Sequence, residues 1–172
     1  MRNSILAMII LAMSGVVTAA EVTVNFEHPE KYTDIKPTND SKSRYQERVL
    51  KAFEGFFTDY AAKVPEGYTW QVTVTDIDLA GDVDYFAGAT GQPLRIVKDL
   101  YSPAIRFTHS LKDSSGKEVL AGEERLRDMG FMHSVSKVSS RNEFEYEKNM
   151  LDEWFTKTIQ PLVNQQTNAA AH

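Results

Sequence analysis

The sequence predicts an α+β domain: an antiparallel or mixed sheet of about four to five strands with two amphipathic helices packed on one face. Three observations predict this class. Two segments repeat apolar residues at helical spacing, several others alternate apolar and polar residues as strands do, and the elements follow the order β-α-β-β-β-α. We expect one domain over residues 21–163, because the chain contains no internal repeat and no interdomain linker.

The first strand and the first helix have clear sequence signals. Residues 22–26 alternate apolar and polar side chains, which predicts a half-buried strand. Aromatic and aliphatic residues then recur at steps of three and four, which predicts an amphipathic helix over about residues 43–63. Pro65-Glu66-Gly67 ends this helix. Three residues compete to cap its start: Asp40, Ser41 and Ser43.

A long strand is expected over residues 68–79, but its alternation slips by one position near the end. Trp70 and Val72 share one face, whereas Ile77 has the parity of the polar residues. A bulge near Thr75-Asp76 would return Ile77 to the core, and the alternative is that both faces are covered there. Residues 80–92 contain three glycines and are expected to be a loop, with a short strand at 94–97.

The clearest hairpin in the chain joins residues 105–111 to residues 117–126. The connecting Asp113-Ser114-Ser115-Gly116 is typical turn chemistry. We expect the following residues to face each other: Lys112 and Lys117, Phe107 and Gly122, Arg106 and Glu123.

The second amphipathic helix follows a serine-rich stretch over residues 130–142. Ser140-x-x-Glu143 has the form of a capping box, and Pro161 should end the helix near Gln160. The polar and alanine-rich tail, residues 164–172, is expected to be disordered.

Residues 1–20 have the form of a secretory signal peptide. Arg2 supplies a positive charge, residues 5–17 are an apolar run, and Thr18-Ala19-Ala20 places small residues at a cleavage site. We expect cleavage after about Ala20, a periplasmic location, and no stable membrane insertion of the mature chain. The alternative is an uncleaved anchor, although a spanning helix needs about 20 apolar residues.

Composition excludes several classes of function. The 172 residues carry a formal net charge of −5 and include no cysteine. An acidic chain lacks the clustered basic surface that phosphate binding needs, so nucleic acid is not an expected partner. Without cysteine there is no disulfide, no thiolate catalysis, and no zinc or iron site built on sulfur. We expect no cofactor.

A cluster of acids is the densest candidate for metal binding. Its four members are Asp76, Asp78, Asp82 and Asp84. Calcium prefers carboxylate oxygens from a flexible loop, and Gly81 would allow a sharp turn. However, Ala80 and Ala87 stand where a calcium loop of the EF-hand type supplies further oxygens. A calcium-responsive binding protein and a solvated acidic loop therefore remain alternative interpretations.

Catalytic signals are sparse. The segments G-x-S-x-G and H-E-x-x-H and a phosphate-binding glycine loop are not present in the sequence. His109 has the parity of the core residues in its strand, and His133 lies in the serine-rich stretch. A small hydrolase using His133 or His109 with a nearby serine or carboxylate is therefore a secondary hypothesis.

Four strings combine residue types in a fairly specific way. They are Asp78-Leu79-Ala80-Gly81, Arg95-Ile96-Val97, Glu123-Glu124-Arg125-Leu126-x-Asp128-Met129 and Tyr146-Glu147-Lys148-x-Met150-Leu151-x-x-Trp154-Phe155. Together they resemble a family of small exported bacterial proteins known as a domain of unknown function, DUF3016. The resemblance implies one exported α+β domain and supplies no activity, ligand or catalytic residue. The order of elements is also similar to small domains of bacterial outer-envelope lipoproteins, which serve as assembly or binding modules.

The leading hypothesis is a non-enzymatic periplasmic module that binds an envelope protein or another envelope component. A binding patch is expected where polar residues interrupt regular elements. Its candidate members are Asp78, Arg95, Arg125, Asp128 and Tyr146. The alternative for two of them is a structural ion pair between Arg125 and Asp128 that anchors the loop after the hairpin.

Overall fold

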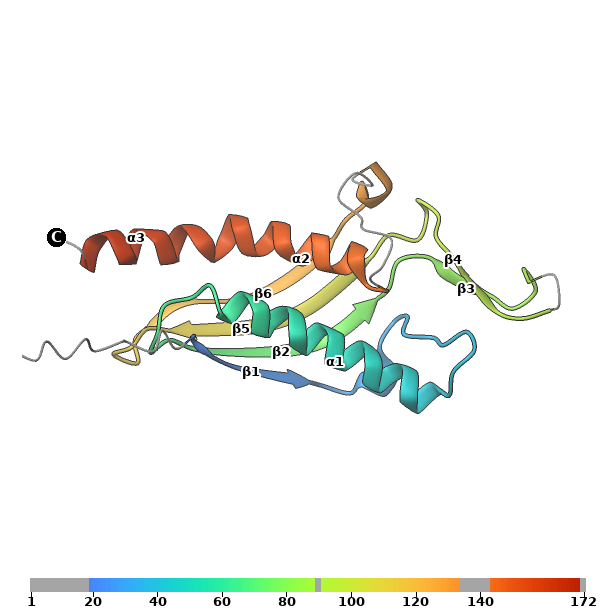
Figure 1. The fold of residues 1–172 in the computed structure, drawn as a ribbon, viewed down its shortest axis with the longest axis horizontal. Coiled ribbons are helices and arrows are strands. Elements are labelled where there is room, and N and C mark those ends of the chain that lie inside the picture. Colours follow the sequence, from blue (N-terminus) through green and yellow to red (C-terminus); the bar gives the residue numbers. More distant parts are fainter. Residues whose placement is uncertain (1–18, 89–90, 134–142, 171–172) are drawn as a thin grey trace, which may run out of the picture.

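The computed structural model describes residues 19–88, 91–133 and 143–170, without the side chains from residue 166 onward. Helices and a sheet form two layers, with the helices on one face of the sheet (Figure 1). The predicted class is therefore confirmed: a four-stranded mixed sheet with amphipathic helices on one face, joined by a smaller two-stranded sheet. The predicted signal peptide falls outside the described residues over 1–18, as does Ser140 of the expected capping box.

The main sheet has the strand order β1-β2-β5-β6. Its strands are β1 (Glu21–Phe26), β2 (Thr69–Asp78), β5 (Ala104–Lys112) and β6 (Glu118–Arg127). β1 pairs in parallel with β2, because helix α1 (Lys42–Ala61) returns the chain across the sheet between them. The β2–β5 and β5–β6 pairs are antiparallel. Both β1 and β6 therefore lie at the edges of the sheet.

Helix α1 begins where the sequence offers three competing caps. Ser41 is the N-cap, and its side chain accepts a hydrogen bond from the backbone N–H of Arg44 at 3.4 Å. The predicted aromatic stripe is buried against the sheet, with Val49, Phe53 and Phe57 fully enclosed. The opposite face of α1 is charged and exposed, as expected of an amphipathic helix on one face of a sheet.

Aromatic rings from both layers meet in the core. Phe57 of α1 packs edge-on against Trp70 of β2 and Phe107 of β5, with ring centroids 5.7 and 5.5 Å apart. Trp154 of helix α2 (Glu145–Thr158) packs edge-on against Phe107 at 4.9 Å. Each large side chain buried in this way contributes about 1.5–3 kcal/mol to stability. The two helices are thus held to the sheet mainly by ring packing.

The predicted bulge in β2 is confirmed. The register with β5 shifts between Val74 and Asp76, which is where the alternation slips in the sequence. As a result Ile77 is fully buried although it has the parity of the polar residues before the bulge.

The predicted hairpin is confirmed as β5 and β6, but its predicted register is wrong, by one residue at Lys112 and by two residues along the rest of the ladder. The observed pairs are Lys112 with Glu118, Phe107 with Glu124, and Arg106 with Arg125. These replace the expected pairs of Lys112 with Lys117, Phe107 with Gly122, and Arg106 with Glu123. From Ala104 to Leu111 the side-chain faces are preserved, because a shift of two keeps the parity of each pair.

Two local features cause this shift. The Asp113 N–H donates to the Lys117 carbonyl at 2.9 Å, so the turn closes a loop of three residues instead of four. The ladder then shifts once more between Leu111 and Lys112, where β6 carries one extra residue.

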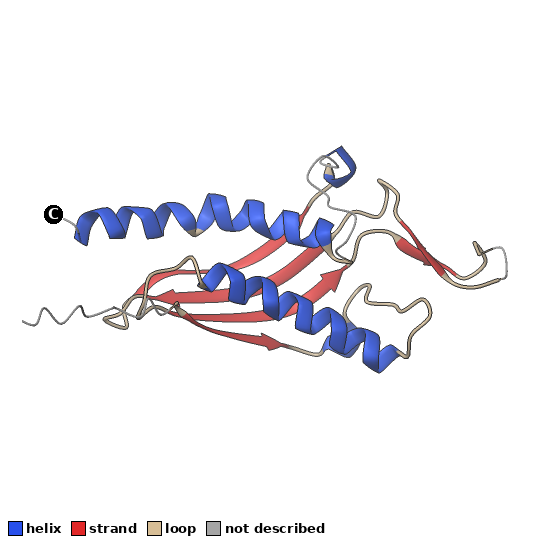
Figure 2. Ribbon diagram, in the orientation of Figure 1, coloured by secondary structure: helices blue, strands red, loops and turns tan. Residues whose placement is uncertain are grey.

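Residues 80–92, expected to be a loop, instead contain strand β3 (Asp82–Asp84). β3 pairs antiparallel with β4 (Leu94–Ile96), which corresponds to the short strand expected at 94–97. This small sheet projects from the end of the main sheet (Figures 1 and 2). We call residues 82–101 the arm. Strand β3 escaped prediction because three residues are too few to show a period.

The chain continues as a helix beyond the expected end of the domain. Pro161 does separate two helices, since α2 ends at Thr158 and α3 (Gln160–Ala170) begins directly after Ile159. The tail over residues 164–172 was expected to be disordered, but residues up to Ala170 belong to α3. Proline is compatible with this restart, because the first turn of a helix needs no N–H from that residue. No helix in the described part of the chain is long and apolar enough to cross a membrane.

Candidate functional site

The structure does not bring the four acids of the calcium hypothesis together. Each carboxylate has a separate neighbour. Asp76 accepts from the N–H and hydroxyl of Thr33, and Asp84 accepts from the N–H of Phe86. Asp78 pairs with Arg127, and Asp82 lies 3.5 Å from the Nζ of Lys36. Within the described residues, no group of three or more His, Asp or Glu side chains is close enough to hold a metal ion. The acids instead fix local turns and strand ends.

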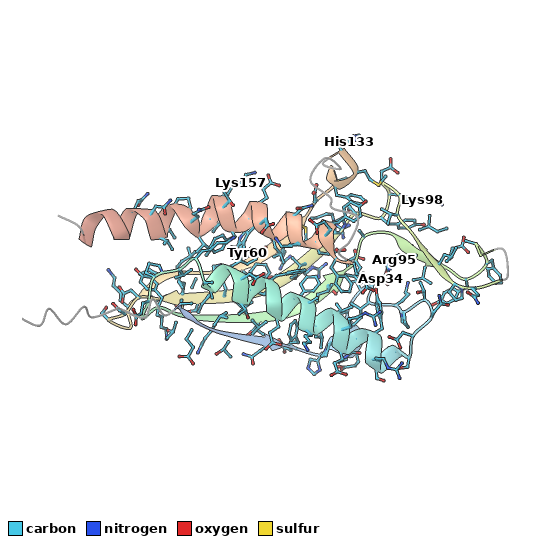
Figure 3. All side chains as sticks on the ribbon, viewed as in Figure 1. Asp34, Tyr60, Arg95, Lys98, His133 and Lys157 are labelled. Atoms are coloured by element: carbon cyan, nitrogen blue, oxygen red, sulfur yellow. The ribbon has the colours of Figure 1, made fainter. Side chains whose placement is uncertain are left out.

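The two histidines of the hydrolase hypothesis lie in unrelated places. His109 is buried beneath Trp154, and its Nε2 is 3.2 Å from a carboxylate oxygen of Glu124. Burial lowers the pKa of His109, an effect that Glu124 partly opposes. His133 is exposed on the loop after β6 (Figure 3). His109 is therefore a packed core residue whose Nε2 contacts the carboxylate of Glu124.

The five residues of the expected binding patch are divided between different surfaces. Arg95 and Tyr146 line a cavity of about 170 Å³, whereas Asp78 and Arg125 line another of about 270 Å³. The ion pair considered for Arg125 and Asp128 is not formed. Arg125 pairs with Glu123 at 2.8 Å, and Asp128 accepts from the N–H of Gly130 at 2.9 Å.

Arg95 makes the densest set of polar contacts at the base of the arm. Its guanidinium binds both carboxylate oxygens of Asp34, at 2.9 and 3.2 Å, and the two labels lie side by side in Figure 3. It also donates to the backbone carbonyls of Lys36, Ala80 and Gly81 at 3.1–3.3 Å. Burial alone would lower the pKa of Arg95. The hydrogen bonds and the charge of Asp34 outweigh this effect and raise the pKa above its ordinary value, so the guanidinium stays charged.

Glu147, on the helix layer, binds the same backbone segment at Ala80 that Arg95 binds from β4. This residue of α2 is only 2% exposed, and its Oε1 accepts from the N–H of Ala80 at 2.7 Å. Burial raises the pKa of Glu147, while the Ala80 N–H and the charge of Arg95 oppose the shift. The Ala80 residue is therefore bound at its N–H by a helix and at its carbonyl by β4. We call Asp34, Arg95 and Glu147 the clamp.

Gly81 makes this close approach possible. Its φ is +80°, a left-handed conformation that favours glycine, and a Cβ there would lie 2.6 Å from the carbonyl oxygen of Ile96. The Gly81 N–H donates to the carbonyl of Tyr101 at 2.9 Å. The chain enters the arm at Gly81 and leaves it at Tyr101, so this bond ties the two ends of the arm together.

The arm exposes large apolar side chains, whereas the body buries almost all of its own. Five of the six exposed large apolar residues in the described chain lie on the arm, the sixth being Met129. These five are Tyr85, Phe86, Leu94, Leu100 and Tyr101. Phe86 is 91% exposed and Leu100 77%. Clustered apolar exposure of this kind is typical of interaction sites, whereas single exposed residues are ordinary.

Sequence reasoning missed this surface because it treated residues 80–92 as a loop defined by glycine. A usable signal was present. The adjacent aromatics Tyr85 and Phe86 follow Asp84 in a segment without strand or helix period, so no core position was available for them.

Comparison with known protein families gives one finding. A family model described as "Protein of unknown function (DUF3016)" matches residues 20–157. The chain belongs to the DUF3016 family. This match spans both layers and the arm. Comparison with curated proteins found no match, and comparison with solved structures found none either.

The strings that resemble the DUF3016 family have a common structural setting. The string at residues 78–81 forms the entry to the arm, the string at 95–97 supplies Arg95 and the carbonyl of Ile96, and the string at 146–155 supplies Glu147. Three of the four strings therefore meet at the clamp, where they fix the point from which the arm leaves the body.

Proposed function

We propose that this DUF3016 protein is an exported, non-enzymatic binding module that docks on an envelope protein through the apolar side chains of the arm. The single observation that carries the proposal is the concentration of exposed large apolar residues on that one projection. Such exposure is unfavourable in water, and covering it would remove apolar area from water at about 25 cal/mol per Å².

The clamp supports a role in recognition because it limits the freedom of the arm at its base. Arg95 and Glu147 engage the backbone of residues 80–81, so little conformational entropy remains to be lost there on binding. A pre-organised arm favours binding to a specific partner over nonspecific hydrophobic association. The tip beyond the clamp keeps its side chains free for contact.

Charge favours a protein partner over an anionic membrane surface. The charged residues of the arm outside the clamp are Asp82, Asp84, Lys98 and Asp99. Three of these four are acidic, whereas segments that insert apolar residues into anionic lipid surfaces carry lysine and arginine around them. The periplasmic location rests on the signal-like pattern of residues 1–20, which supports an envelope protein as the partner.

Site-specific photo-crosslinking in the native envelope tests the proposal. The substitution Phe86→p-benzoylphenylalanine should yield a discrete protein adduct on irradiation, because this side chain would lie within the interface. The matched control is Met129→p-benzoylphenylalanine, since Met129 is also apolar and 79% exposed but lies off the arm. A chain cleaved after about Ala20 would begin at Glu21, so the mass of the recovered protein reports export.

A second variant separates docking from random collision. Leu100→Ser in the crosslinking background should reduce the adduct about tenfold, because it removes a neighbouring contact without touching the core. Equal adducts at Phe86 and Met129, adducts with lipid alone, or no adduct at Phe86 would each overturn the proposal.

A further inference from the structure

β1 presents an unpaired backbone edge. The N–H groups of Glu21 and Glu27 donate to carbonyls of the β2 side, at 3.0 and 2.9 Å. Successive residues of a strand point their N–H and carbonyl groups to opposite sides, so Val22, Val24 and Phe26 point theirs away from β2. Within the described residues, no strand lies beyond β1. Three donors and three acceptors therefore face outward in a row.

This edge lacks the usual protection against strand addition. Natural proteins protect exposed edges with proline, inward-pointing charges, bulges or a covering element. β1 has the sequence EVTVNF, with no proline and no lysine, and its register with β2 is regular over all six residues. The opposite edge, β6, differs because it carries a bulge and the charged residues Glu123, Arg125 and Arg127.

A groove runs beside the same edge, between β1 and α1. It has a volume of about 510 Å³. Val24 and Phe26 of β1 and Leu50 of α1 give it an apolar floor, and each of them is only partly buried. Side chains of a strand added to β1 would enter this groove at every second residue, because that is the spacing at which a strand points to one face.

We propose that β1 binds an extended peptide segment of another protein as an additional strand, with alternate apolar residues in the groove and a net positive charge. Two acids of α1, Glu47 and Glu54, line the groove against a single base, Lys51. Within the described chain, neither acid takes part in an ion pair. Glu21 and Glu27 add negative charge at the two ends of β1. Lysine or arginine in the added strand complements this surface.

The same charges disfavour a second copy of this chain as the occupant. An antiparallel pairing of β1 with itself, centred on Val24, would place Glu21 opposite Glu27 of the second copy at both ends. Like charges directly opposite in a ladder are destabilising. A basic peptide avoids this repulsion. The site uses no residue of the arm, so it is independent of the function proposed above.

Hydrogen exchange of the full chain with a synthetic probe tests the site. The probe is a capped peptide of about ten residues that alternates threonine with a second set, valine in the middle and lysine at both ends, so that valine and lysine share the face turned to the groove. Its binding should slow the exchange of the N–H groups of Val22, Val24 and Phe26. A peptide of equal composition with the valines in one block is the control, because it cannot present alternate side chains to the groove.

Two pairs of variants locate the binding on the protein. Val24→Pro removes one outward N–H and is tolerated on an edge strand, so it should weaken probe binding about tenfold, whereas Val24→Thr keeps the N–H and should bind nearly as well. Glu47→Lys combined with Glu54→Lys should weaken the lysine probe and strengthen an otherwise equal glutamate probe. Phe86→Ser should leave probe binding unchanged.

Several results would overturn the proposal. One is unchanged exchange at β1 with saturating probe. Another is equal binding of the alternating and block peptides. A third is concentration-dependent dimerisation that Val24→Pro abolishes, since this would identify the occupant of the edge as a second copy of the chain.

Discussion

The body and the arm use the same residue types in opposite ways. Phe107 in the body is fully buried between α1 and α2, whereas Phe86 on the arm is 91% exposed. Charge shows the reverse contrast. The Lys148–Asp152 and Lys157–Glu153 pairs of α2 are at least partly exposed, whereas the clamp at the base of the arm buries Asp34 and Glu147. The stability of the fold therefore explains the apolar residues of the body, but it does not explain the exposed apolar residues of the arm.

Burial separates structural residues from candidate functional residues in a family of unknown function. A buried ring contributes through area removed from water, so its presence needs no partner. An exposed ring on a braced projection contributes nothing to the isolated fold. Its contribution must be sought in a complex, which is why the arm carries our functional proposal.

The largest expected effect comes from removing the same side chain in the two regions. Phe107→Ala should lower the free energy of unfolding by about 3–5 kcal/mol, because it leaves a cavity between Phe57 and Trp154. Phe86→Ala should change it by less than about 0.5 kcal/mol. Urea unfolding followed by tryptophan fluorescence measures both. Equal losses would show that the arm belongs to the folded core and would remove the contrast.

A smaller effect is expected at the clamp. Arg95→Met should cost about 3 kcal/mol, because it leaves the Asp34 carboxylate buried without its partner. Hydrogen exchange should accelerate at β3 and β4 while β2 and β5 stay protected. Arg106→Met is the matched control, since Arg106 is an exposed arginine on β5 and its loss should be nearly neutral. Loss of protection throughout the sheet would contradict a local role for the clamp.

The smallest effect concerns the pH dependence of the clamp. Burial raises the pKa of Glu147 in the folded chain above its ordinary value of 4.5. The folded state therefore binds this proton more tightly, so the contribution of Glu147 to stability is full below pH 4.5 and is lost as the pH rises through the folded pKa. Glu147→Gln keeps an oxygen for the Ala80 N–H but does not titrate.

Thermal unfolding at a series of pH values measures this difference. The melting temperature of the wild type minus that of Glu147→Gln should decrease as the pH rises from 4 to 7, because the folded pKa of Glu147 lies above its ordinary value. A difference that increases with pH would mean that the ionised carboxylate is the form the fold stabilises.

Much of the body could be predicted from the sequence because its elements are long enough to show a period. Helix α1, the hairpin and the slip that marks the bulge before Ile77 all follow from alternation of apolar and polar residues. The hairpin register could not be predicted, since it depends on a three-residue loop and on one extra residue in β6. In this hairpin the alternation of apolar and polar residues does not depend on loop length or on a single extra residue at the end of the ladder, so it cannot predict either.

The site was harder to predict for a different reason. Arg95 and Asp34 are 61 residues apart, and neither lies in a long regular element that would fix its neighbours. The sequence indicated Arg95, Asp78 and Tyr146 as unusual polar residues, but only the fold reveals that Arg95 and Tyr146 line one cavity and Asp78 another. The acids at residues 76–84 were the densest signal for a metal site in the sequence, yet each of them contacts a different residue.

The position of the arm in the ladder has a consequence for how the fold can vary. Asp78, the last residue of β2, pairs directly with Ala104, the first residue of β5, so the chain returns to the sheet at the rung where it left. The whole excursion is topologically equivalent to the tip of a hairpin. A longer, shorter or different segment between residues 78 and 104 would therefore leave the ladder on either side intact.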